Sequence, residues 1–146
     1  MKMKRTRTIV AVFLFSAIAL VSCKKESASE SEQPYTANCN GDSQAPPNGS
    51  TATATFNGKY NSSTGTFSGT LTYSGITPTG WYVQKGTTLV NGEIIASLGA
   101  VVTSPVSINI QLSASAAAEL KAGNCYVNIQ SAAYPSGEIR GKLVAK

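Results

Sequence analysis

Few side chains of this chain could carry acid–base catalysis, and they stand far apart. The carboxylates beyond the first 40 residues are Asp42, Glu93, Glu119 and Glu138. Glycosidases need two carboxyl groups that flank the bond they cleave, so a hydrolase of envelope polysaccharide that used Glu93 and Glu138 is one hypothesis. Strand alternation places Glu138 and Arg140 on the same face, and a structural ion pair is the simpler interpretation of Glu138.

Histidine is absent from the chain, which excludes Ser-His-Asp and Cys-His arrangements for nucleophilic catalysis. Histidine is also the commonest metal ligand, and the sequence has neither metal-ligand spacing nor a glycine-rich phosphate loop. We therefore expect no catalytic residue, no metal and no cofactor. A metal-storage or redox domain is a further hypothesis, and the missing imidazoles count against it.

Cys39 and Cys125 could form a disulfide bond. An even number of cysteines in an oxidising compartment favours pairing. This bridge would close a loop of nearly 90 residues, for a stabilisation of about 4 kcal/mol. The alternative is two free thiols, with Cys125 buried in a strand.

The N-terminal segment is typical of an export signal. Residues 1–8 are basic, and residues 9–21 form an apolar run of 13 residues, which as a helix would rise about 20 Å, less than a bilayer core of ~30 Å. A signal peptide over residues 1–22 fits better than a membrane span. The sequence Leu-Val-Ser-Cys that ends at Cys23 resembles a lipobox, in which the cysteine is acylated and becomes the new N-terminus.

Two or three acyl chains hold a protein stably at a membrane, so we expect a lipid anchor at Cys23. Lys24 follows the cysteine where aspartate would signal inner-membrane retention, and this favours the outer membrane, with the domain facing the periplasm or the cell surface. An ordinary signal peptide with a nearby cysteine is the alternative, and it would release the domain.

The net charge of +5 does not indicate nucleic-acid binding. Four of the 12 basic residues precede the apolar run, and from Cys23 onward eight basic residues face seven acidic ones. The mature chain has no cluster of Lys and Arg that could neutralise a row of phosphates.

Composition changes along the mature chain and predicts a tether followed by a domain. Residues 23–49 are polar and small, cannot bury enough apolar area to fold, and are expected to be a flexible spacer. Residues 50–146 alternate between apolar and polar residues, with turn signals between the segments. Seven strands are predicted near residues 51–60, 67–73, 81–84, 92–102, 106–112, 125–131 and 138–144.

One short helix interrupts these strands. Ser113 is a suitable N-cap for a helix over Ala114–Ala122, and Gly123 is a suitable stop. The fold expected is all-β, an immunoglobulin-like or Greek-key β-sandwich or barrel. Trp81 and Tyr82, beside a loop rich in Gly and Pro, are the candidate binding surface for a glycan or an envelope protein. Aromatic residues of this kind more often pack in the core or against turns, and this is the alternative.

The C-terminal third carries a specific motif. Residues 120–143 read LKAGNCYVNIQSAAYPSGEIRGKL, and this segment closely resembles the end of the CHRD domain, a family named after chordin. The resemblance reaches back to TLTYSG at residues 70–75 and covers about residues 50–146. It implies an extracellular immunoglobulin-like β-fold with no settled catalytic activity, in keeping with a non-catalytic binding or structural role.

The chain departs from the family at two positions. Members usually carry histidines after the front hairpin and in the Tyr-Val-Asn-x-His motif, where this chain has Gln84 and Gln130. Glutamine does not titrate near neutrality and is a poor metal ligand, so any imidazole site that the family holds is absent. A hydrogen-bonded pair of the two glutamines is one interpretation of the double replacement.

Overall fold

The computed structural model describes residues 31–86 and 90–146. This part contains the strands β1 (Glu32–Asn40), β2 (Thr53–Asn61), β3 (Thr66–Ser74), β4 (Pro78–Lys85), β5 (Ile94–Ser97), β6 (Val106–Gln111), β7 (Cys125–Ser131), β8 (Ile139–Lys142) and β9 (Val144–Ala145), and the helix α1 (Ala114–Lys121). The prediction of an all-β fold with one short helix is confirmed. The expected signal segment and Cys23 lie outside the described residues. Within those residues, no helix has the length and apolar character needed to cross a membrane.

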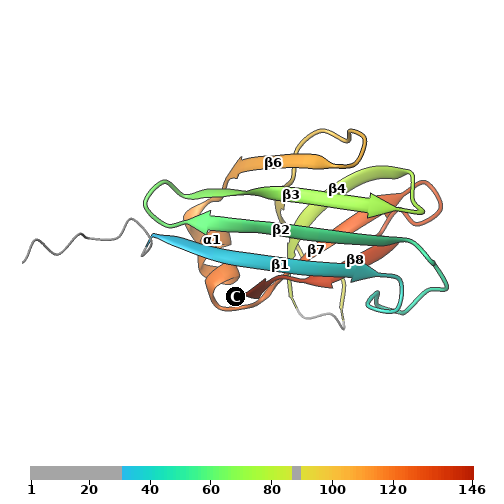
Figure 1. The fold of residues 1–146 in the computed structure, drawn as a ribbon. Helices are drawn as coiled ribbons and strands as arrows, with labels where there is room; N and C mark the ends of the chain where they lie inside the picture. Colours follow the sequence, from blue (N-terminus) through green and yellow to red (C-terminus); the bar gives the residue numbers. More distant parts are fainter. Residues whose placement is uncertain (1–30, 87–89) are drawn as a thin grey trace, which may run out of the picture.

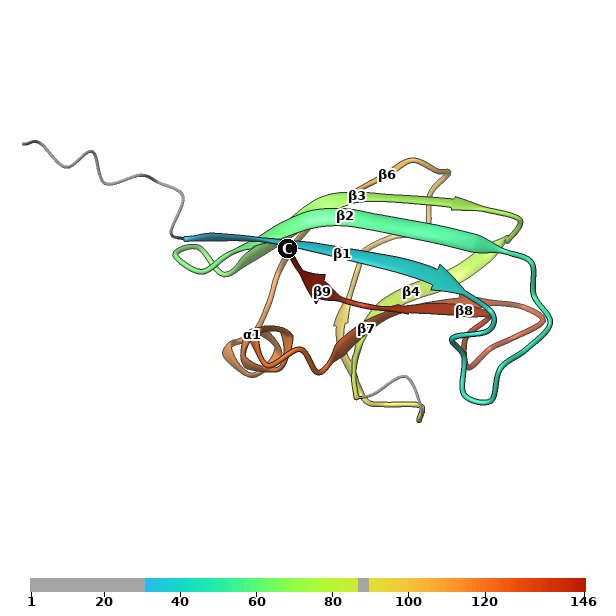
Figure 2. The ribbon, with the colours of Figure 1, turned by 60° about the horizontal axis from the view of Figure 1, so that its bottom comes forward.

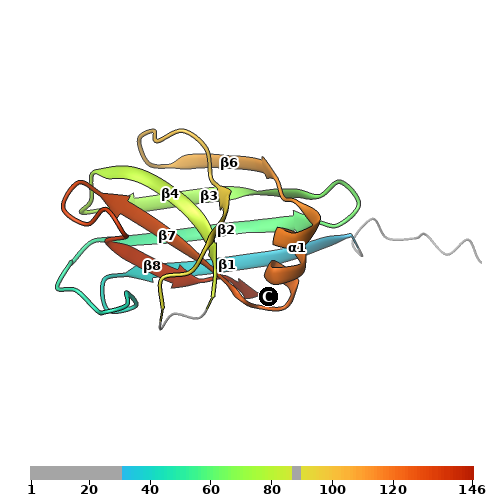
Figure 3. The same ribbon diagram turned by 180° about the vertical axis from the view of Figure 1, so that it is seen from behind.

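A single antiparallel sheet contains the strands, in the order β5-β4-β7-β8-β1-β2-β3-β6, and β9 pairs with β1. Figure 1 shows β1, β2, β3 and β6 on the near side, and Figure 3 shows β4, β7 and β8 from behind. Seen from the direction of Figure 2, the two halves face each other as layers. The fold is thus one curled sheet, an open half-barrel.

Strand alternation fills the space between the two halves with apolar side chains. In β2 and β3, Phe56 and Phe67 are fully buried and stack with their ring centroids 4.9 Å apart. The opposite half contributes Trp81, Val127 and Ile129, which are equally buried. Burial of such side chains stabilises a fold by roughly 1.5–3 kcal/mol each, so this core holds the sheet in its curled shape.

Helix α1 begins at the predicted residue, Ala114, and ends one residue earlier than predicted, at Lys121. The Ser113 side-chain oxygen accepts a hydrogen bond from the backbone N–H of Ala116 at 3.1 Å, which makes Ser113 the N-cap. Gly123 follows the helix at φ +74°, a conformation that glycine adopts without strain. Leu120 is buried, and the helix lies at the end of the half-barrel where β1 begins (Figures 1 and 3).

The predicted domain boundary at residue 50 is wrong, because β1 belongs to the sheet. All nine residues of β1 pair with β2, and its other edge pairs with β8 and β9. Tyr35, Ala37 and Cys39 point inward and are buried, an alternation that polar neighbours obscure in the sequence. The expected tether over residues 23–49 therefore extends at most to residue 31, and residues 41–49 form a loop that returns onto the sheet.

The strand predicted over residues 92–102 is shorter than expected. Only Ile94–Ser97 pairs, as β5, with β4. Val101 and Val102 follow outside the sheet and remain exposed. The apolar run in this segment thus overstated the length of the strand.

The predicted disulfide bond is not formed, and Cys39 and Cys125 are buried free thiols. β8 lies between the strands that carry them, and the continuing register places Cys39 beside Gly141, and Gly141 beside Val127. Cys125 therefore lies on β7, two strands away from Cys39, and is displaced by two residues along β7 from the position level with Cys39. Since neighbouring strands lie about 4.8 Å apart and a disulfide needs Cα atoms within about 7 Å, the two thiols are too distant to bridge.

Candidate functional site

The outer face of β4, β7 and β8 is unusually polar and yet buried. Tyr126 and Asn128 alternate with the core residues of β7, and Arg140 lies beside Asn128 on β8. These three side chains face away from the apolar core, as the alternation of a strand requires. They are nonetheless completely inaccessible to solvent, because loops before β2 and before β5 cover them.

Arg140 is the centre of this buried layer. Its guanidinium carbon lies 4.5 Å from the ring centroid of Tyr126. The Nε atom donates to Gln44 Oε1 at 2.8 Å, Nη1 donates to the carbonyl of Val90 at 3.0 Å, and Nη2 donates to Asn91 Oδ1. Burial lowers the pKa of Arg140, and Tyr126 opposes this shift.

No carboxylate in the described part of the chain forms an ion pair with Arg140. Its charge is held by neutral oxygens and an aromatic face, an arrangement in which each hydrogen bond is worth more than in water. Arg140 therefore fixes the positions of two loop segments that have no regular structure of their own, one at Gln44 and one at Val90 and Asn91.

A second chain of hydrogen bonds connects the loops to each other. The Nε2 atom of Gln44 donates to Asn128 Oδ1 at 2.9 Å, and Asn128 Nδ2 donates to the carbonyl of Ser136 at 2.9 Å. Gln44 thus accepts from Arg140 and donates to Asn128, so both ends of its amide are used. The loop before β2 and the turn before β8 are held side by side.

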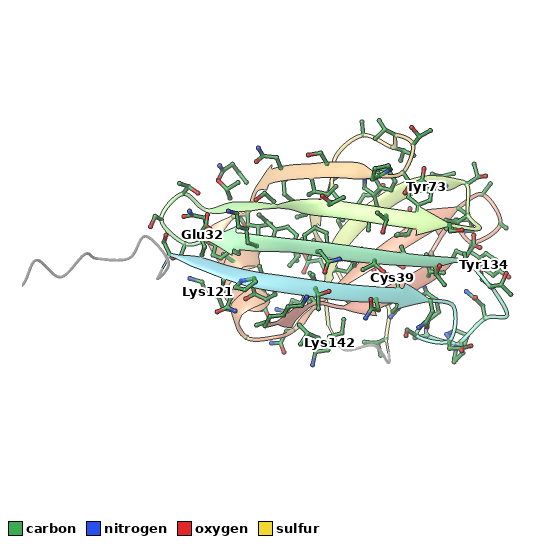
Figure 4. All side chains as sticks on the ribbon, in the orientation of Figure 1. Glu32, Cys39, Tyr73, Lys121, Tyr134 and Lys142 are labelled. Atoms are coloured by element: carbon green, nitrogen blue, oxygen red, sulfur yellow. The ribbon has the colours of Figure 1, made fainter. Side chains whose placement is uncertain are left out.

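A cavity of about 350 Å³ opens between these loops. Its lining includes Gln44, Pro46, Asn48, Asn91, Tyr134 and Pro135. The described residues of the lining contribute amide groups, proline rings and one tyrosine ring, and none of them has a charged side chain. Figure 4 shows Tyr134 at the end of the domain opposite Glu32 and Lys121.

The predicted binding surface at Trp81 and Tyr82 is not formed as expected. Trp81 points into the core and is fully buried, with its ring centroid 5.9 Å from that of Tyr73, and its Nε1 has no hydrogen-bond partner. Tyr82 alternates outward and is half-buried. The nearby Gly and Pro residues indicated a loop, but Pro78, Gly80 and Trp81 are part of β4.

Gln84 and Gln130, where the family usually has histidine, lie on neighbouring strands but not opposite each other. Gln84 faces Tyr126, and Gln130 faces Gly80, so four residues of strand separate them. The interpretation as a hydrogen-bonded pair is therefore wrong. Gln84 is buried, and its Oε1 has no hydrogen-bond partner. Within residues 31–86 and 90–146, no group of three or more His, Cys, Asp or Glu could hold a metal ion.

The two carboxylates of the hydrolase hypothesis are separated by two strands of the sheet. The Glu93 backbone accepts from Lys85 of β4, and the Glu138 backbone donates to Ile129 of β7. β4 and β7 therefore run between them. Glu138 Oε1 instead accepts a hydrogen bond from Ser50 Oγ at 2.6 Å, which gives this carboxylate a structural role, and the two groups cannot flank one glycosidic bond.

Sequence reasoning missed Gln44 and Asn91, the two side chains that line the cavity and also bind Arg140. Both lie in polar loop segments without periodicity, and Gln44 lies in the expected tether. No local signal distinguishes them from other exposed amides. Their role depends on contacts with Arg140, which lies 96 positions after Gln44 and 49 positions after Asn91.

Comparison with known proteins gives one result. A family model described as the CHRD domain matches residues 35–143. None of the curated proteins matches the chain, and none of the solved structures does. The matched region begins within β1 and includes Arg140, Tyr126 and Asn128. Since the match covers most of the sequence, the chain belongs to the CHRD domain family.

Proposed function

We propose that this chain is a lipid-anchored protein of the cell envelope whose CHRD domain binds a neutral glycan without catalysis. The observation that carries the proposal is the cavity at Tyr134, which is preorganised by the buried Arg140 network. Ligand sites combine an apolar lining with a few fixed polar groups. Here the fixed groups are amides, and the apolar surface comes from proline rings and Tyr134.

The chemistry of the lining favours a sugar over an ion. An amide side chain offers a donor and an acceptor together, which suits the hydroxyl groups of a saccharide. Asn48 donates to the Glu138 carbonyl and accepts from the Ser50 N–H, and Asn91 Oδ1 accepts from Arg140. These bonds fix both amides, and each amide has a second N–H or lone pair for a sugar hydroxyl. Tyr134 keeps 37% of its surface exposed, so its ring is available for stacking against a sugar. A volume of about 350 Å³ is at the small end of the range for ligand pockets.

Binding can be tested with neutral oligosaccharides such as chitotriose, cellotriose and maltotriose, by saturation-transfer NMR on the purified full chain. Tyr134→Ala and Asn91→Ala are expected to weaken binding by about tenfold or more, as the loss of a central contact does. Asn109→Ala is the matched control, because Asn109 is exposed on β6, away from the cavity. Oligosaccharide binding that all three variants retain would contradict the assignment of the cavity.

The lipid anchor is supported by the lipobox-like sequence that ends at Cys23. Nine positions separate Cys23 from Glu32, where β1 begins, and a chain of this length spans at most about 32 Å. An acylated Cys23 would therefore hold the domain close to the outer-membrane surface. The expected arrangement is a domain on a short connection, which restricts the glycans it can reach to those near the bilayer.

Intact-mass spectrometry of the membrane-extracted protein tests the anchor. The expected mass is that of residues 23–146 with acyl chains added, and it should not change on reduction, because the two remaining cysteines are free thiols. An unlipidated mass would show that the domain is released. A gain of two hydrogens on reduction would instead reveal a disulfide bond that the register of β1, β8 and β7 does not allow.

A further inference from the structure

The opposite end of the half-barrel carries a second cavity, of about 500 Å³. It is lined by residues from the beginning of β1, the end of β2 and the last turn of α1, among them Glu32, Tyr35, Tyr60, Ser62 and Lys121. Figure 4 shows Glu32 and Lys121 near each other at this end of the sheet, far from Tyr134. The two cavities are therefore separate sites.

Two tyrosines, Tyr35 and Tyr60, line this second cavity. Only 3% of Tyr35 and 5% of Tyr60 is exposed, and both rings pack with the apolar core. Burial raises the pKa of Tyr35, with the thiol of Cys125 and then Tyr60 adding to the effect. Tyr35 thus stays protonated, and remains a donor, at physiological pH.

The charged side chains among the described residues that line this cavity are Glu32 and Lys121. The carboxylate of Glu32 is bound by Lys59, with Nζ 2.9 Å from its oxygen. Lys121 has no carboxylate partner among the described residues, and its Nζ lies 5.4 Å from the ring centroid of Tyr60. Lys85, by contrast, pairs with Glu119 at 2.7 Å. Lys121 is therefore the uncompensated charge at the cavity.

We propose that this second cavity binds an oxyanion, a phosphate or carboxylate group, between the ammonium of Lys121 and the hydroxyls of Tyr35 and Tyr60. A hydroxyl that donates to a charged oxygen forms a stronger hydrogen bond than one that donates to a neutral oxygen. An oxyanion could accept a hydrogen bond from each of the two phenols and balance the charge of the lysine.

The position of the cavity indicates which molecule supplies the oxyanion. This part of the inference rests on the proposed lipid anchor at Cys23. Ser31 is eight residues after Cys23, so an acylated cysteine keeps the cavity within about 28 Å of the bilayer surface. The phosphate of an anionic lipid headgroup is then the nearest abundant oxyanion. Free inorganic phosphate has the same chemistry, and the experiment below separates the two.

The test uses the full chain carrying Cys23→Ser, which cannot be acylated, in neutral maltoside micelles. Inorganic phosphate, dihexanoyl phosphatidylglycerol and dihexanoyl phosphatidylcholine are titrated in turn, and backbone amide NMR signals of Tyr35, Tyr60 and Lys121 are followed. Lys121→Gln removes the charge and is expected to weaken binding about tenfold or more. Tyr60→Phe removes only a hydroxyl, with an expected loss of about three- to tenfold. Lys142→Gln, at an exposed lysine outside the cavity, changes the net charge equally and should bind as the parent does.

Tighter binding of phosphatidylglycerol than of either other probe supports the site and assigns it to a lipid headgroup. Equal or tighter binding of inorganic phosphate supports the site and assigns it to a free oxyanion. The proposal is overturned if no probe shifts these signals at 10 mM, or if Lys121→Gln binds as well as Lys142→Gln. Because acylation plays no part in this experiment, its failure leaves the lipid anchor and the glycan cavity unaffected.

Discussion

Arg140 lies over the ring of Tyr126, on the outer face of two neighbouring strands, and both side chains are completely buried. The ring supplies a negative face for a cation that has no acidic partner in the described part of the chain. The remaining contacts of Arg140 reach the loops at Gln44 and at Val90 and Asn91. Arg140 and Tyr126 thus hold in place Gln44 and Asn91, which line the cavity at Tyr134.

Replacing Arg140 should therefore destabilise the domain. Arg140→Met keeps the aliphatic stem but leaves Gln44 Oε1 and two further acceptors without their donor, so we expect the free energy of unfolding to fall by about 2–4 kcal/mol. Arg140→Lys keeps a charge but not the forked geometry, and should lose roughly half as much. Urea unfolding measures both variants. Lys142→Met, an exposed position on the same strand, is the control and should change stability by less than about 0.5 kcal/mol.

A change at Gly137 should affect both stability and ligand binding. Gly137 has φ +134°, and an added Cβ would overlap the side-chain amide of Asn128, which bonds Gln44. We expect Gly137→Ala to destabilise the domain by about 1–3 kcal/mol and to abolish oligosaccharide binding. The control is Gly99→Ala, where φ is +103° but no atom lies within 4 Å of the new Cβ. If both variants bind the sugar equally, Asn128 does not shape the cavity.

The buried thiols should make the domain sensitive to alkali. Burial raises the pKa of Cys39 from 9.0 to about 12, and burial, followed by the charge of Glu119, raises that of Cys125 to about 11. Well below pH 9, both thiols are protonated in the folded and in the unfolded state. Above pH 9 the unfolded chain releases thiol protons that the folded chain keeps, so stability should fall between pH 9 and about pH 12.

Urea unfolding at pH 7, 9 and 10.5 checks this pH dependence. For Cys39 alone, a shift of about three pKa units corresponds to a limiting loss of about 4 kcal/mol. Cys39→Ala should therefore show a shallower decline above pH 9 than the parent, despite a lower stability at pH 7. Parallel pH profiles for the two proteins would mean that this thiol has the same pKa in the folded protein as in the unfolded chain.

The N-cap of α1 should contribute to the stability of the helix that carries Lys121. Lys121 lines the second cavity and lies in the last turn of α1. Ser113→Ala removes the oxygen that accepts from Ala116 and should reduce the free energy of unfolding by about 1 kcal/mol. Ser113→Asp retains an acceptor and should keep the stability of the parent. A loss in Ser113→Asp as large as that in Ser113→Ala would show that the cap bond contributes little.

The helix and most strands could be predicted because their signals are local. Ser113 and Gly123 bracket a short run of helix formers, and the alternation in β6 and β7 places one apolar face toward the core. β1 was not predicted because its inward residues are few, alternate with polar residues and follow a charged segment, so the strand resembled a continuation of the tether. Its assignment depends on β2 and β8, which supply its partners from distant parts of the chain.

The candidate site was less predictable than the fold. Alternation alone correctly separated Ile139, in the core, from Arg140, on the outer face. It could not show that the outer face is covered, because the covering groups come from irregular loops at Gln44 and Asn91. Trp81 was expected at the surface because Gly and Pro residues lie nearby. Its burial depends on contacts with distant strands, which the local sequence does not indicate.

The position of β1 between β2 and β8 also sets the order in which the chain can fold. β2 follows β1 after a short loop, so these two strands can pair early, whereas β8 and β9 arrive about 100 residues later. Until then one edge of β1 has unsatisfied N–H and C=O groups that could pair with another chain. Because closing so long a loop is slow, we expect the last strands to pair late in folding, and a chain truncated before residue 139 should expose an edge prone to aggregation.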